Sequence, residues 1–375
     1  MTTTLRMIPI VILVLTTSAR SQGQTLEIQP TPNPLSTNNE LYAATAISLT
    51  DAWTVGQVAL HWNGSQWSGV PISGKGVVFN GVAAVSSNDV WAAGSLNNID
   101  SGFSRAVIEH WDGTAWTNVT IPRPGVSSVL TSIAAFSSND VWAAGWFENS
   151  TETAIQPLIE QWNGTAWTVV SDPVEQDTVF VTGIAGSSAS DIWVVGYVEP
   201  GSVDEPFAQH WNGTGWTETA VPVRGQGSNI MYGVVAPAPN DAWAVGLSTT
   251  KAPPAESVTL TLIEHWDGTA WQVVSSPNVG PTSIFQSNRL FGITALSSTD
   301  IWAVGSSFAA NGSGDQFTLV EHWDGTSWTI SPTPDLGFSD TLFGGAAIDG
   351  TVWLAGSYFG GKPISSTLVL STTGI

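Results

Sequence analysis

The 375-residue chain has no cysteine, and it has only nine lysine and arginine residues against 30 aspartate and glutamate residues. Without cysteine there can be no disulfide, no thiolate metal ligand and no cysteine nucleophile. A formal charge of −21 leaves no basic surface that could neutralise phosphates, which argues against a nucleic-acid partner. Charged residues make up only 10% of the chain, so Ser, Thr, Asn and Gly must provide most of the polar surface.

Long apolar segments and helical periodicity are also missing. No segment carries a 3.6-residue apolar period long enough for a helix, and none is long and apolar enough to span a membrane. Residues 1–21 have the pattern of a secretory signal peptide: Arg6 is followed by the apolar residues 7–15 and by small residues up to Ala19 and Ser21. We therefore expect a protein that is secreted and works outside the cell.

What the chain has in quantity is tryptophan, and 19 of its 20 Trp residues occupy repeat positions; Trp146 is the exception. The string Asp-x-Trp-x-x-Gly begins at Asp51, Asp89, Asp140, Asp191, Asp241 and Asp300, and a seventh copy around Trp353 has lost its Asp. A second string, Glu-His-Trp-Asp-Gly-Thr-Ala-Trp at residues 109–116, recurs in similar form around Trp62, Trp162, Trp211, Trp266 and Trp323.

Each repeat unit predicts four short strands, which in the third unit are residues 133–136, 141–146, 158–162 and 166–170. Between the last two strands we expect Asn163-Gly164 to form a two-residue hairpin with φ positive at both residues. Four strands in each of seven units of about 50 residues predict an all-β fold, a seven-bladed β-propeller of four-stranded antiparallel blades. Its single domain should span residues 25–375, with blades at about 41–73, 77–122, 128–172, 178–222, 228–276, 286–332 and 338–375.

The last unit stops at Ile375 before a fourth strand. Residues 25–32 can be aligned with residues 327–334, which hold the fourth strand of the sixth unit and its exit. We therefore expect residues 25–32 to complete the seventh blade and close the ring, which would remove an open sheet edge.

The two repeated strings resemble those of secreted bacterial β-propeller repeat proteins, which are loosely grouped with kelch and galactose-oxidase-like propellers and are mostly uncharacterised. This resemblance covers nearly the whole mature chain and implies an architecture, but it carries no catalytic residues. The Trp-Asp dipeptides do not indicate the WD40 family, because they precede a hairpin, alternate with Trp-Asn and lack an upstream Gly-His.

The repeated His and Asp residues are expected to be structural. The five His residues hold one position of the repeat, so they are spread around the ring and cannot converge on one metal ion. We expect each imidazole to pack between blades and to donate one hydrogen bond, and each repeated Asp to accept backbone N–H bonds from its turn. We expect no metal and no cofactor. We also expect no enzyme activity; a glycosidase or lyase is the less favoured alternative.

The two faces of the predicted propeller differ in their loops. One face carries uniform turns, whereas the loops on the other face vary in length, and variable loops on a rigid scaffold commonly bind ligands. The seven basic residues that lie beyond Arg20 all fall in these variable loops. From this face we select as candidate ligand-binding residues Arg123, Arg224, Arg289, Lys75, Arg105, Tyr232, Phe285 and Trp146.

Phe79, Phe291 and Phe343 stand just before the first strand of their units, and we expect them to fill the core rather than to bind a ligand. Taken together, the sequence favours a monomeric secreted binding or adhesion module that holds a glycan, a peptide or a protein on the variable face. The alternative is a structural or protein-interaction scaffold.

Overall fold

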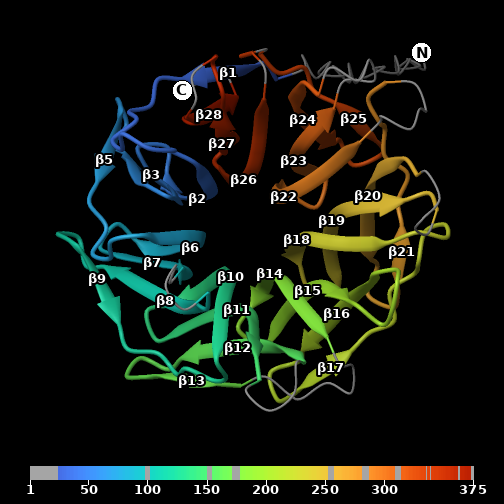
Figure 1. The fold of residues 1–375 in the computed structure, drawn as a ribbon, viewed down its shortest axis with the longest axis horizontal. Coiled ribbons are helices and arrows are strands. Elements are labelled where there is room, and N and C mark those ends of the chain that lie inside the picture. The colour runs from blue at the N-terminus through green and yellow to red at the C-terminus, as the bar shows by residue number, and fades with distance from the viewer. Residues whose placement is uncertain are drawn as a thin grey trace, which may run out of the picture.

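The computed structural model describes residues 24–97, 102–149, 154–170, 178–251, 257–280, 287–308, 314–334, 336–337, 339–361 and 364–372. These residues form 28 strands in seven four-stranded sheets, arranged as blades around a central channel (Figure 1). The prediction of an all-β seven-bladed propeller is confirmed. The expected signal peptide lies outside the described residues, and within them no helix is long and apolar enough to cross a membrane.

We name the strands of each blade A to D from the channel outward. Blade 1 contains β2 (Leu41–Ser48), β3 (Asp51–Gly56), β4 (Ala59–Trp62) and β5 (Trp67–Val70). Blade 2 contains β6 (Val77–Ser86), β7 (Asp89–Asn97), β8 (Ser104–Trp111) and β9 (Trp116–Val119). Blade 3 contains β10 (Ser127–Ser137), β11 (Asp140–Glu148), β12 (Ile155–Trp162) and β13 (Trp167–Val169). Blade 4 contains β14 (Val179–Ser188), β15 (Asp191–Val198), β16 (Glu205–Trp211) and β17 (Trp216–Glu218).

Blade 5 contains β18 (Asn229–Ala238), β19 (Asp241–Thr249), β20 (Thr259–Trp266) and β21 (Trp271–Val273). Blade 6 contains β22 (Asn288–Ser297), β23 (Asp300–Phe308), β24 (Gln316–Trp323) and β25 (Trp328–Ile330). Blade 7 contains β26 (Asp340–Ile348), β27 (Thr351–Tyr358), β28 (Ser366–Thr372) and, as its outermost strand, β1 (Leu26–Gln29). The A–B turns, and the C–D turns of blades 1 to 6, lie on one face of the ring, the turn face; the B–C and D–A connections lie on the other, the loop face.

The ring is closed by β1, as the sequence predicted. This strand pairs antiparallel with β28, with Leu26 opposite Thr372 and Gln29 opposite Val369, and in Figure 1 it runs along the outer edge of the blade that contains β26, β27 and β28. Leu26 is buried in the core between blades 6 and 7 together with Trp302. The N-terminal strand therefore completes the hydrophobic core as well as the hydrogen-bond ladder.

The repeated tryptophans join neighbouring blades. Trp243 of strand B is buried, and its ring centroid lies 5.0 Å from that of Trp323 and 5.7 Å from that of Trp328, both on the next blade. Equivalent contacts link the first five blades, each to the next. Large indole surfaces buried between sheets thus hold together a ring that has no disulfide.

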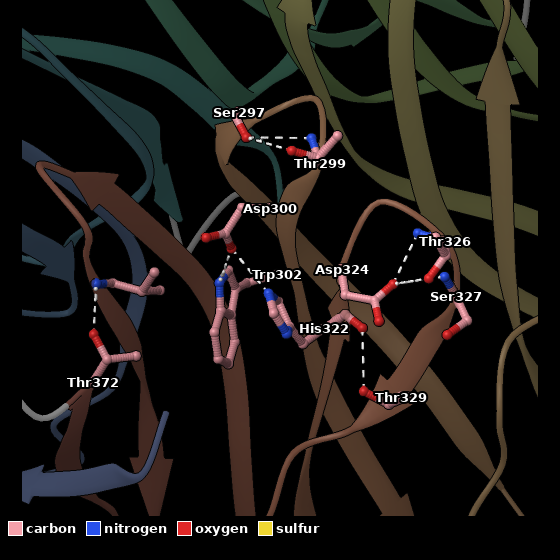
Figure 2. A network of polar contacts seen from close by, with 11 residues as sticks. Ser297, Thr299, Asp300, Trp302, His322, Asp324, Thr326, Ser327, Thr329 and Thr372 are labelled. Atoms are coloured by element: carbon pink, nitrogen blue, oxygen red, sulfur yellow. Dashed lines mark hydrogen bonds and ion pairs between the residues drawn. The ribbon is translucent and has the colours of Figure 1, made fainter. Parts of the chain in front are cut away.

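A repeated polar unit lies at the turn-face end of the blades (Figure 2). Asp300 accepts hydrogen bonds from Trp302 Nε1 and from His322 Nε2, both at 2.9 Å, and the imidazole stacks on the indole. The expectation that this Asp accepts backbone N–H bonds is therefore wrong for the described residues. The buried indole N–H would otherwise have no acceptor, and it takes the carboxylate, which the partly exposed imidazole shares.

The expected two-residue hairpin between strands C and D is also wrong. Trp162 pairs with Trp167, so four residues form the turn, and only Gly164 among them has a positive φ, of 89°. Asn163 Oδ1 accepts the backbone N–H groups of Thr165 and Ala166, each at 3.0 Å. This side-chain-capped turn explains why Asp replaces Asn in other blades, because a carboxylate accepts the same bonds, as Asp324 does in Figure 2. Asp324 also accepts a hydrogen bond from the Thr326 hydroxyl. This bond, together with the two backbone bonds, lowers the pKa of Asp324 to about 2.

Candidate binding site on the loop face

Each innermost strand contributes one bulged residue to the lining of the channel. Every strand A carries a β-bulge at the same depth, where the register with strand B shifts by one residue. A bulge re-aims a side chain out of the regular alternation of the strand. The bulged residues all line a central cavity of about 210 Å³: Tyr42, Asn80, Thr131, Thr182, Tyr232, Phe291 and Phe343.

Four of these seven residues are aromatic, and they are consecutive around the ring, from blade 5 through blades 6 and 7 to blade 1. The ring centroids lie 5.4 Å apart between Tyr232 and Phe291, 5.5 Å apart between Phe291 and Phe343, and 5.0 Å apart between Phe343 and Tyr42. All four are only partly buried. One half of the channel is therefore an aromatic wall.

The other half is polar, and its side chains bond to the backbone of the next blade. Asn80 Nδ2 donates to Leu130 O at 2.8 Å, the Thr131 hydroxyl to Val181 O at 3.0 Å, and the Thr182 hydroxyl to Met231 O at 2.7 Å. These donors are already used in joining innermost strands. The aromatic half is thus the part of the channel with free surface for a ligand.

A second aromatic cluster lies nearer the loop face, on blades 3 and 4. Trp146 packs edge-on against Phe180 at 5.5 Å, and Phe180 stacks on Tyr197 at 5.0 Å. The three rings are partly buried. Burial, together with the Glu199 carboxylate, Tyr232 and Asp204, raises the pKa of Tyr197 to about 12. The phenol therefore stays protonated at neutral pH and can donate a hydrogen bond.

The charge at the channel mouth comes from few groups. Burial raises the pKa of Tyr232, the Arg289 guanidinium beside it acts in the opposite direction, and Asp204 raises the pKa further. Arg289 Nε donates to Ser287 Oγ at 3.2 Å. Of the residues selected from the sequence, Tyr232 and Trp146 thus belong to the two aromatic clusters, and Arg289 lies beside Tyr232.

The other predicted basic residues lie elsewhere on the loop face. Arg105 and Arg123, both exposed, line a separate pocket of about 240 Å³ between blades 2 and 3. Arg224 is held by its own blade: its guanidinium donates to Thr261 O at 2.8 Å and its backbone N–H to Asn229 Oδ1 at 2.9 Å. Lys75 lines a third hollow, between blades 1 and 2. The structure thus places Arg123, Arg224 and Arg289 in three different surroundings.

Two sequence expectations about these residues need correction. Arg105 lies in β8 and Arg289 in β22, at the loop-face ends of strands rather than in loops. Phe79 is fully buried in the core, as expected, but Phe291 and Phe343 line the channel, because the bulge turns them away from the blade interior. Phe285 lies outside the described residues.

Sequence reasoning missed Tyr42 and Tyr197. A local signal did exist for the channel residues, because five of the seven bulged residues directly precede a glycine, as in Tyr232-Gly233 and Phe291-Gly292. Innermost strands approach so closely there that a side chain on the second residue would meet the neighbouring backbone. A residue followed directly by glycine in the first half of strand A therefore marks the channel lining.

No family model and no curated protein matches this chain. Solved structures with a similar fold include YCF48 bound to a D1 peptide, with 12% identity and a TM-score of 0.55, covering 93% of this chain and 97% of that chain. YCF48 from Cyanidioschyzon merolae has 12% identity and a TM-score of 0.56, over 93% and 98% of the two chains. The WD40 propeller domain of Doa1 has 12% identity and a TM-score of 0.59, over 93% and 97%. At this identity the likeness is one of fold.

Proposed function

We propose that this protein is a secreted binding module that holds a peptide segment of a partner protein on its loop face, across the mouth of the channel. The observation that supports it most directly is the pair of aromatic clusters, Trp146–Phe180–Tyr197 at the mouth and Tyr232–Phe291–Phe343–Tyr42 below it. Partly exposed aromatic rings on a rigid scaffold are typical anchors for a protein ligand.

A peptide fits this site better than a sugar. Phe180 and Tyr197 stack on each other with an interplanar angle of 21°, so each ring has one face already covered and less open surface on which a sugar could stack. The channel cavity of about 210 Å³ has room for one inserted side chain rather than for a chain of rings. The similar fold of YCF48, a propeller solved with a bound D1 peptide, supports the same choice.

The charges at the mouth indicate what the peptide should carry. Glu199 and Asp204 lie near Tyr197, and the protein as a whole has a formal charge of −21. We therefore expect peptides that combine an aromatic or aliphatic residue, for the aromatic wall, with a nearby basic residue for these carboxylates.

Peptide and glycan arrays probed with the mature protein test the proposal. We expect peptide binding, and about a tenfold loss of affinity in Trp146→Ala and in Tyr197→Ala, because each removes an aromatic anchor. The matched control is Lys251→Ala, an exposed position of the same face outside these clusters, which should bind as the unchanged protein does. Binding to glycans alone, or peptide binding that neither aromatic substitution weakens, would overturn the proposal.

A further inference from the structure

The hollow on the loop face that Lys75 lines has a different chemistry from the channel. It is a groove of about 900 Å³ between blades 1 and 2, next to the segment that leads from β1 to β2. Its apolar walls are Leu35, Ile72, Val77, Val78 and Ile364, and Leu35 is 41% exposed. Among the described residues that line it, the one charged side chain is that of Lys75, which is exposed.

No acidic residue is among the described residues that line the groove, although the chain has 30 acidic and nine basic residues. Within the part of the chain that the structure describes, the ion pairs are all between His and Asp, so Lys75 has no carboxylate partner there. Two carboxylates lie beside the groove, and both already accept hydrogen bonds. Glu109 is fully buried and accepts bonds from Ser73 and Gly74, and Glu40 accepts bonds from the hydroxyl groups of Ser365 and Tyr42. The ammonium group of Lys75 is thus left for an anion from outside the protein.

Both walls of the groove are held by buried polar side chains. Glu109 fixes residues 73 and 74, directly before Lys75, through three hydrogen bonds of 2.6 to 3.1 Å. On the opposite wall the fully buried Asn39 binds the backbone of Leu35 and Thr37 at 2.8 to 3.1 Å. A groove with fixed walls loses little conformational entropy when it takes a ligand.

The groove also adjoins the channel site. Val78 lines the groove and lies two residues before the channel residue Asn80 on the same strand. Gln57, another groove residue, donates its backbone N–H to Glu40 O, two residues before Tyr42. A chain bound at the channel mouth can therefore continue into the groove.

From these observations we infer that the groove binds the C-terminal end of a peptide, with an aliphatic last side chain against Leu35 and Ile72 and its terminal carboxylate on Lys75. A C-terminal leucine or isoleucine is the part of a peptide that joins an aliphatic side chain to a free carboxylate on the same residue. The inference rests on the proposed peptide-binding function and adds which end of the peptide is recognised.

The test uses two small probes that do not depend on the channel site, N-acetyl-leucine and N-acetyl-leucinamide, titrated by NMR into the mature protein. We expect the carboxylate probe to bind about tenfold more tightly than the amide, because only the carboxylate pairs with Lys75. In Lys75→Ala the two probes should bind equally weakly, whereas the control Lys251→Ala should keep the difference.

The outcomes separate this inference from the proposed function. Equal affinity for the two probes, no binding of either, or a difference that persists in Lys75→Ala would overturn the C-terminal site even if peptides bind at the channel. Preference for decanoate over N-acetyl-leucine, lost in Lys75→Ala, would replace the peptide with a fatty acid. If Trp146→Ala no longer binds the peptide array but still binds N-acetyl-leucine more tightly than N-acetyl-leucinamide, the result supports both sites.

Discussion

Ser73 donates its backbone N–H, at 3.0 Å, and its hydroxyl, at 2.6 Å, to the buried carboxylate of Glu109. The same glutamate recurs on strand C as Glu160, Glu264 and Glu321, all fully buried. In the connections that lead into those blades the residue equivalent to Ser73 is a proline, at Pro122, Pro222 and Pro277. Proline has no N–H to donate, and for Glu160 and Glu264 no hydrogen-bond partner is present among the described residues.

These glutamates make stability depend on pH. Burial raises the pKa of Glu160 from 4.5 to about 8, and it does the same to Glu264, where the nearby Arg224 partly opposes it. Between those two pH values the unfolded chain releases a proton that the folded protein keeps, so stability falls as pH rises, by about 1.4 kcal/mol per pH unit for each such group. Below pH 4.5 this loss of stability is absent, and above pH 8 it has reached its full size.

Glu160→Gln should therefore stabilise the protein at alkaline pH, because glutamine has the same shape and no proton to lose. We expect its free energy of unfolding at pH 8 to be higher by about 2–4 kcal/mol, and to equal that of the unchanged protein at pH 4. Urea unfolding at a series of pH values measures this. Glu109→Gln is the matched control, and we expect it to lower the free energy of unfolding, because it weakens charge-assisted bonds to Ser73 and Gly74. A change of the same sign in both variants would contradict the explanation.

The repeated polar unit gives a second prediction. Asp241 accepts hydrogen bonds from Trp243 Nε1 at 2.9 Å and His265 Nε2 at 2.8 Å, and Trp243 is only 3% exposed. Asp241→Ala leaves the indole N–H buried without an acceptor, and it should cost about 1–3 kcal/mol of stability in thermal denaturation. Asp241→Asn keeps an oxygen acceptor and should recover a good part of the loss. Equal midpoints for the Ala variant and the unchanged protein would show that the unit is not structural.

The blade number, the strand order and the closing strand followed from the sequence because each depends on a repeated pattern or on its interruption. The position of the site did not. Phe79 stands two residues before a glycine and Phe291 one. The bulge therefore falls on Asn80 in blade 2 and on Phe291 in blade 6, so Phe291 lines the channel, whereas Phe79 stays in the core. Likewise, Arg224 and Arg289 are both candidate ligand-binding residues in the sequence, but Arg224 is bound to Thr261 O. Bulge register and local acceptors are set by contacts between blades, which no single repeat reveals.

A third prediction concerns the closing strand. Leu26 is 3% exposed and packs in the core between blades 6 and 7, whereas Ile28 on the same strand is 43% exposed. Leu26→Ala should lower stability by about 2–4 kcal/mol because it leaves a cavity, and Ile28→Ala should change it by less than about 0.5 kcal/mol. Deletion of residues 25–32 should lower the melting midpoint sharply and promote aggregation, because it exposes the edge of β28. An unchanged midpoint after that deletion would refute the role of β1 in closing the ring.

The last prediction concerns the crowding around the channel. A Cβ on Gly292 would lie 2.4 Å from Phe343 O on the next innermost strand, a distance that real Cβ atoms essentially never show. Gly292→Ala must therefore push blades 6 and 7 apart, next to the aromatic pair Phe291–Phe343. We expect a loss of about 1–3 kcal/mol in stability and weaker binding of any ligand that uses the aromatic wall. Gly215→Ala is the control, because a Cβ there meets nothing within 4 Å and its φ is ordinary. If thermal denaturation shows the two alanine variants to be equally stable, the innermost strands have more room than the structure gives them, and the channel lining is not fixed by their close approach.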